Sequence, residues 1–128
     1  MNVPPSPSEF TLLIADAVAG SKASDIVLLD VSQSSSLADW FVLSTARSAI
    51  HVRAVCEQVE HAANSYGVRA SSREGVEFAH WALLDYGDVV VHVFQNDTRR
   101  LYDLERLWHK APRSVYREGR LSPLEVVH

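Results

Sequence analysis

The sequence is poor in cysteine and contains no long apolar run. Cys56 is the only cysteine among 128 residues, so an internal disulfide bond is excluded and a reducing compartment, the cytoplasm, is expected. No apolar run reaches the roughly 20 residues that a membrane-spanning helix needs. The first arginine is Arg47, and the N-terminal region lacks the basic start of a signal or transit peptide. We therefore expect a cytoplasmic protein without a membrane segment.

The chain also lacks an excess of positive charge. Its net charge is −4, which argues against direct nucleic-acid binding as more than a minor contribution, because such binding usually needs a basic surface. Residues 74–98 contain five acidic residues and no lysine or arginine. An acidic segment that is also rich in aromatic residues suits a basic protein partner. An acidic surface without any partner is the alternative.

Apolar residues recur at helical spacing in two segments. A helix is expected from a cap at Ser6, completed by Glu9, to Gly20. A longer helix is expected over residues 48–66, with Gly67 as its stop. A third, short helix is predicted near the C-terminal end, over residues 99–108.

Runs rich in β-branched and aromatic residues predict strands between these helices. The strands are expected at residues 25–31, 40–45, 68–72, 78–84 and 89–94. The order of helices and strands predicts a single α/β domain with a mixed sheet flanked by helices. We place this domain at residues 1–112 and expect a loosely held tail over residues 113–128.

The two strands over residues 78–84 and 89–94 predict a β-hairpin with a two-residue turn at Tyr86-Gly87. Such a turn pairs Asp85 with Asp88 and Trp81 with His92, and it separates the side chains into two faces. One face is almost wholly apolar and is expected in the core: Phe78, His80, Ala82, Leu84, Val89, Val91 and Val93. The other face is mixed: Trp81, Leu83, Asp85, Asp88, Val90, His92 and Phe94.

The mixed face is an informative feature of the sequence. Burial of Asp85 and Asp88 without partners would be costly, yet the face is too apolar for an ordinary surface. Apolar surface bordered by polar groups often marks an interaction site, and tryptophan is common among residues that dominate binding energy. The alternative is that a helix covers Trp81 and Leu83 while the acidic residues lie at the edge. Both interpretations stay open at this point.

Several short motifs, taken in order, resemble the ribosome-silencing factor (RsfS, Iojap) family. The motifs are KASDI at 22–26, LDVS at 29–32, LADWFV at 37–42, REG at 73–75, WALLDYGDVVVHVF at 81–94, Arg99, and YDLERLW at 102–108. The resemblance covers Ser8 to Pro112. Two segments depart from it: residues 44–48 lack the glycine that the family usually has, and Ile50-His51 stands where the family commonly has Arg-Gln.

This resemblance implies both a fold and a function. The family folds as a small α/β domain with a nucleotidyltransferase-like topology but without catalysis. It binds the large ribosomal subunit through ribosomal protein L14 and prevents the small subunit from joining, which represses translation in starvation. The resemblance also implies a homodimer when the protein is free, and a role in large-subunit biogenesis. No cofactor is implied.

The partner-binding residues are carried over from the family motifs. The hairpin motif contributes Trp81, Leu83, Asp85, Tyr86, Asp88 and His92, with Trp81 as the anchor and His92 as a hydrogen-bonding residue at the edge. The adjoining motif contributes Arg99, Tyr102 and Asp103 as a second group.

The main alternative is a nucleotidyltransferase-like enzyme on the same fold. Such chemistry needs carboxylates that hold Mg²⁺ and a loop for the phosphates. Asp85 and Asp88 lie three positions apart across a turn, which is not an Asp-x-Asp spacing, and Ser44–Ser48 contains no glycine. The histidines show no His-x-x-x-His spacing, so no metal site is expected. Cys56 lies in an apolar helical stripe and is expected to be a packed core thiol.

Overall fold

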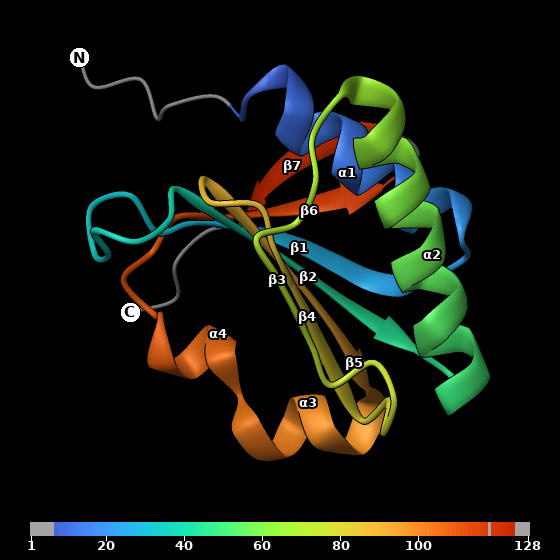
Figure 1. Cartoon of the computed structure of the whole chain (residues 1–128). Helices are drawn as coiled ribbons and strands as arrows, with labels where there is room; N and C mark the ends of the chain where they lie inside the picture. The colour runs from blue at the N-terminus through green and yellow to red at the C-terminus, as the bar shows by residue number, and fades with distance from the viewer. Residues whose placement is uncertain (1–6, 118, 125–128) are drawn as a thin grey trace.

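Residues 7–117 and 119–124 are described by a computed structural model, shown in Figure 1. The elements, in chain order, are α1 (Glu9–Gly20), β1 (Ser24–Asp30), β2 (Trp40–Ala46), α2 (Ala49–Tyr66), β3 (Ser72–Glu74), β4 (Trp81–Asp85), β5 (Val89–Gln95), α3 (Asn96–Tyr102), α4 (Leu104–Leu107), β6 (Arg113–Arg117) and β7 (Arg120–Leu124). This confirms the predicted α/β fold.

The strands form one mixed sheet at the centre of the molecule. Its strand order is β3-β4-β5-β2-β1-β6-β7. β2 and β5 run parallel, and every other neighbouring pair in the sheet is antiparallel. The parallel pair lies in the middle, where both faces of the sheet are covered, as is usual for parallel strands.

Helices cover both faces of this sheet, as Figure 1 shows. α1 and α2 pack against each other and over one face, which holds the larger core cluster, including Leu28, Val42 and Val91. α3 and α4 lie on the opposite side, over a smaller cluster that includes Leu29 and Phe94. Alternate residues of each strand therefore contribute to two cores.

Local signals explain where the two long helices begin and end. α1 begins after Ser8, whose hydroxyl accepts a hydrogen bond from the Thr11 amide, and α2 begins after Ser48, which caps it in the same way. Gly67 ends α2 with a φ of +92°, in the left-handed region that glycine adopts without strain. The predicted cap of the first helix, Ser6, lies outside the described residues.

Three predicted boundaries are wrong. β3 begins at Ser72 and not near residue 68. The strand predicted from Phe78 begins only at Trp81, because Ala79 has a φ of +57°, and it leaves Phe78 80% exposed. The predicted helix over residues 99–108 is broken at Asp103, whose φ is +45°.

The segment predicted as a loose tail also differs from the expectation. β6 pairs with β1, and β7 pairs with β6, so residues 113–117 and 120–124 extend the same sheet. Tyr116 is buried and joins the larger core cluster, which anchors this hairpin to the domain. The backbone pairing with β1 outweighs the unfavourable local composition of this segment. Residues 125–128 lie outside the described part of the chain.

Candidate functional site

The β4–β5 hairpin carries the predicted site, but its register differs from the prediction. Leu83 faces His92, and Trp81 faces Phe94. The Tyr86 amide donates to the Val89 carbonyl at 2.9 Å, so the turn is formed by Gly87-Asp88, one residue later than predicted. The pairing therefore shifts by two positions, and a shift of two leaves every side chain on its predicted face.

The apolar face of the hairpin lies in the core as expected. Ala82, Leu84, Val91 and Val93 are fully buried in the larger cluster beneath α1 and α2. His80 was assigned to this face, but it precedes β4 and is exposed. The same holds for Phe78, since the strand begins after both residues.

The mixed face carries a row of aromatic side chains. Trp81 stacks on Phe94 with ring centroids 5.1 Å apart, and it contacts Tyr102 of α3 at 4.8 Å. Phe41 of β2 contacts His92 at 4.9 Å and Trp108 at 5.3 Å. We call the set Trp108, Phe41, His92, Trp81 and Tyr102 the aromatic row. It crosses β2, β5 and β4, and its ends lie on the segments of α3 and α4.

The aromatic row is only partly covered. Phe41, Trp81 and Trp108 are half-buried, and Tyr102 is 54% exposed. Leu101 and Leu107, next in the chain to Tyr102 and Trp108, are exposed large apolar side chains. A helix thus covers one side of Trp81, as the second interpretation expected, and leaves apolar area at the surface. The interaction site stays a prediction. Such a surface can bind a protein partner.

His92 occupies the centre of the row and is 4% exposed. Its Nδ1 accepts a hydrogen bond from the Trp81 indole Nε1 at 3.1 Å, which assigns the ring proton to Nε2. Burial lowers the pKa of His92 to about 4, opposed by the nearby Asp85 carboxylate. His92 is therefore neutral at pH 7 and orients Trp81, and its predicted position at the edge of the site is wrong.

The two acidic residues lie at the end of the hairpin. Asp85 is half-buried, and its Oδ1 accepts a hydrogen bond from the Gly87 amide at 2.8 Å. Asp88 is exposed in the turn, and its carbonyl oxygen accepts from the amides of Asp39 and Trp40. Asp85 therefore has a structural role in the turn, whereas the Asp88 side chain faces solvent.

Tyr86 lies away from the other predicted site residues. Its ring contacts Phe10 of α1 edge-on at 5.5 Å and packs against the larger core cluster. Burial raises the pKa of Tyr86 to about 12. Because Tyr86 pairs with Val89, its side chain points to the face opposite Trp81 and Asp85.

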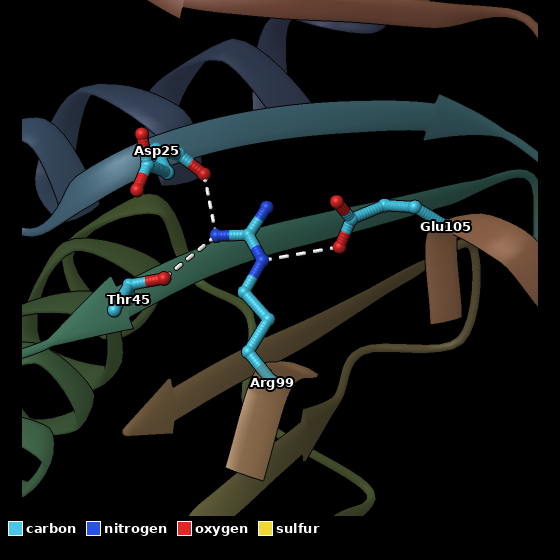
Figure 2. Close-up of polar contacts among 4 residues, drawn as sticks. All are labelled: Asp25, Thr45, Arg99 and Glu105. Carbon is cyan, nitrogen blue, oxygen red and sulfur yellow. Dashed lines mark hydrogen bonds and ion pairs between the residues drawn. The ribbon is translucent and has the colours of Figure 1, made fainter. Parts of the chain in front are cut away.

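Arg99 is buried, and two of its side-chain nitrogens donate hydrogen bonds, as Figure 2 shows. Nη1 donates to the Asp25 carbonyl at 2.6 Å and to the Thr45 hydroxyl at 2.8 Å. Nε donates to the Glu105 carboxylate at 3.1 Å. Arg99 thus joins α3 to β1, β2 and α4, and it holds Tyr102, which lies in the same short helix.

Asp103 is the residue that separates α3 from α4. Its amide donates to the Arg99 carbonyl, and its own carbonyl accepts from the amides of Arg106 and Leu107. This break turns the chain so that Tyr102 and Trp108 both reach the mixed face. Of the second predicted group, only Tyr102 therefore belongs to the aromatic row.

Sequence reasoning missed Phe41 and Trp108 as members of this surface. Strand alternation in residues 40–45 places Phe41 and Leu43 on one face, which is a usable signal. No local sequence pattern predicts the parallel pairing of Phe41 with Val90.

Metal ligands, the single cysteine and the helices bear on other kinds of site in the described residues. No group of three or more His, Cys, Asp or Glu residues among them is arranged to hold a metal ion. Cys56 is buried, and burial raises the pKa of its thiol to about 12, so it is an unreactive core residue as predicted. None of the described helices combines the length and the apolar character that crossing a membrane requires.

Comparison with known proteins finds extensive similarity. The family described as "Ribosomal silencing factor during starvation" matches residues 4–126. The ribosomal silencing factor RsfS of Halalkalibacterium halodurans is 39% identical over 91% of this chain and 99% of its own length. The RsfS of Bacillus subtilis is also 39% identical, over 78% of this chain and 85% of its own. A mouse relative, named "Mitochondrial assembly of ribosomal large subunit protein 1", is 25% identical over 75% of this chain and 43% of its own.

Two crystal structures share the fold. A Chromobacterium violaceum protein has a TM-score of 0.77 and 37% identity, over 78% of this chain and 83% of its own. A Bacillus halodurans protein has a TM-score of 0.69 and 38% identity, over 75% of this chain and 90% of its own.

Proposed function

The chain belongs to the ribosomal silencing factor (RsfS) family, and from this premise we propose that it binds the large ribosomal subunit through ribosomal protein L14 and blocks the small subunit from joining. The partner surface in this proposal is the exposed part of the aromatic row together with Leu83, Asp85 and Asp88. Translation is repressed because a subunit that carries this domain is unavailable for joining.

The partly exposed and firmly held side chain of Trp81 is the observation that carries the proposal. It is half-buried, and its indole is held by the hydrogen bond to His92 and by stacking on Phe94. A large side chain that is already fixed loses little conformational entropy on binding. Tryptophans in such positions commonly dominate the binding energy of an interface.

Charge supports a basic partner. Asp88 is exposed and Asp85 is half-exposed beside the row, and residues 74–98 contain no lysine or arginine. Acidic groups at the edge of an apolar surface attract a basic partner and orient it during encounter. Tyr86 and Arg99 contribute indirectly, since the first packs on the α1 side and the second holds α3.

In this mechanism, the docked domain blocks subunit joining by steric exclusion. A folded domain of 14.2 kDa, docked on the surface that the small subunit must reach, needs no catalytic residue, no cofactor and no direct contact with RNA. We place this activity in the cytoplasm. We also propose that the domain assists large-subunit biogenesis, as the name of the mouse relative says of that protein.

The same surface is our candidate for self-association. Tyr102, Leu101 and Leu107 expose apolar area in the monomer, and a homodimer would cover it. If the dimer and ribosome surfaces overlap, an excess of purified ribosomal protein L14 converts the dimer into a one-to-one complex. A light-scattering mass that corresponds to an intact dimer carrying two partners would reject the overlap.

Co-sedimentation with purified ribosomal subunits tests the proposed function. The protein is expected in the large-subunit fraction, with little in the fractions of small subunits or joined ribosomes. Pre-incubation of large subunits with the protein should also reduce the yield of joined ribosomes, in proportion to the fraction of large subunits that carry the protein. Equal recovery with both subunits, or with neither, contradicts the proposal.

A further inference from the structure

A second potential site lies at the carboxyl ends of the parallel strands β2 and β5. From these adjacent ends the chain continues into α2 on one face of the sheet and into α3 on the other (Figure 1). In open α/β sheets, ligands bind in the crevice that forms where neighbouring strands send their helices to opposite faces. The topology therefore marks this end of the sheet as a ligand site.

Two adjoining cavities occupy this end of the sheet. Their volumes are about 740 Å³ and 620 Å³, and both are lined by Asp25, Thr45 and Asn96. Either volume is in the range of cavities that hold small molecules. No residue of the aromatic row lines them, so this site is separate from the proposed ribosome-binding surface.

A buried guanidinium lines the larger cavity. Arg99 is 9% exposed, and its Nε and Nη1 have the partners Asp25, Thr45 and Glu105. Within residues 7–117 and 119–124, the side-chain hydrogen bonds of Arg99 are made by Nε and Nη1, and Nη2 has no partner. Among the four residues drawn in Figure 2, Nη2 likewise makes no contact. Two N–H donors of a rigidly held cation are thus available to a ligand.

Two residues close to Arg99 in space have an unusual backbone conformation. Asp25 has a φ of +48° and Asp103 a φ of +45°, and both residues line the larger cavity. The pairing of β1 with β2 also shifts between Ser24 and Val27, next to Asp25. Non-glycine residues in the left-handed region are uncommon and gather at functional sites. Here they shape the wall of the cavity around Arg99.

The lining combines charged and apolar side chains. Three acidic residues (Asp25, Asp103, Glu105) balance three arginines (Arg99, Arg100, Arg117), in a chain whose net charge is −4. Five apolar residues also line the cavity: Ala19, Ala23, Ile26, Val27 and Val115. Thr45, Asn96 and Tyr116 complete the wall. This end of the molecule is therefore less negative than the average of the chain, and an apolar body can lie beside the charged groups.

We propose that this cavity binds a small organic anion, a carboxylate or a phosphate ester attached to an apolar body. The anionic group accepts hydrogen bonds from Nη2 of Arg99, since guanidinium N–H groups match the oxygens of carboxylates and phosphates. The apolar body packs against Ile26, Val27 and Val115.

Titration of the ¹⁵N-labelled chain, followed by NMR, tests this proposal directly. Phenyl phosphate and benzoate are the two ligand probes, and benzyl alcohol is the neutral control. Saturable shifts are expected at the amides of Asp25, Thr45 and Asn96 and at the Arg99 Nε–H. The probe that saturates first identifies phosphate or carboxylate as the preferred group. Absence of saturation with both probes up to about 10 mM, a range that detects millimolar complexes, overturns the proposal.

A matched pair of variants locates the binding. Ala19→Leu adds bulk at the cavity wall on α1, whereas Ala62→Leu makes the same change at a partly buried position of α2 that does not line the cavity. Ala19→Leu should weaken binding at least tenfold, and Ala62→Leu should leave it unchanged. A folded Ala19→Leu variant that binds like the wild type rejects this location. None of these results depends on binding to the ribosome.

Discussion

The indole Nε1 of Trp81 donates a hydrogen bond of 3.1 Å to Nδ1 of His92, a residue that is almost wholly buried. This pair links the core of the hairpin to its exposed surface. A neutral His92 accepts the bond, and a protonated His92 has no lone pair on Nδ1 with which to accept it. The orientation of Trp81 thus depends on the protonation state of His92.

The stability of the domain should fall as the pH is lowered from 6.5 to 4. The pKa of His92 is lowered to about 4 in the folded chain, against about 6.5 in an unfolded one. In this range the unfolded chain binds the extra proton, so the stability from neutral His92 is complete above pH 6.5 and is lost as the pH falls through 4. The loss is on the order of 3 kcal/mol. Urea unfolding across this range measures it, and His92→Phe should remove most of the slope; an unchanged slope would contradict the assignment.

Arg99 should contribute strongly to stability. Arg99→Lys keeps the charge but cannot serve Asp25, Thr45 and Glu105 at once, so it should lower the free energy of unfolding by about 2 kcal/mol. Glu105→Gln removes only the ionic part of a partly exposed pair and should cost less than about 1 kcal/mol. Urea denaturation compares the two variants. An equal cost for both would mean that the bonds to Asp25 and Thr45 contribute little.

Gly75 should tolerate alanine less well than Gly87. Both have positive φ, +75° and +84°. A Cβ at Gly75 would lie 2.0 Å from the Trp81 carbonyl oxygen, whereas one at Gly87 would meet nothing within 4 Å. Gly87→Ala should therefore cost about 1 kcal/mol from backbone strain, and Gly75→Ala more than about 2 kcal/mol, because backbone must also move. Denaturant midpoints for the two variants decide this; similar midpoints would refute the close approach.

Asp88 should affect the rate of association more than the final affinity. Its side chain is exposed at the end of the hairpin, so Asp88→Asn should slow association with large subunits several-fold at low salt. The difference in association rate should shrink near 0.5 M salt, where the Debye length is roughly half its value at 0.1 M. Asp16→Asn, an exposed change on α1, is the control. Stopped-flow traces that are identical for the wild type and Asp88→Asn at low salt would remove Asp88 from the interface.

The faces of the hairpin could be predicted from the sequence, although its register could not. Side chains alternate with a period of two, so the shift of the turn from Tyr86-Gly87 to Gly87-Asp88 preserved both faces. Tyr86 was grouped with Asp85 because the two are neighbours in one motif. In a strand, neighbours point to opposite faces, and Tyr86 accordingly packs on Phe10.

Long-range packing explains what the sequence could not reveal. Arg99 was predicted as a surface contact, but it bonds to Asp25, which is 74 positions earlier in the chain. Phe41 and Trp108 join the aromatic row through the pairing of β2 with β5 and through the break at Asp103. No local pattern encodes either event. The pairing of β6 with β1 was missed for the same reason.

The affinity of the Trp81→Ala variant for purified large subunits tests whether the aromatic row forms the ribosome-binding surface. Phe78→Ala is the matched control, since Phe78 is also an aromatic residue, is 80% exposed and lies outside the aromatic row. Amide NMR spectra first establish that both variants are folded. Trp81→Ala should lose about 2–4 kcal/mol of binding free energy, the usual effect of removing an anchor residue, and Phe78→Ala should bind like the wild type. A folded Trp81→Ala variant with wild-type affinity would contradict the account.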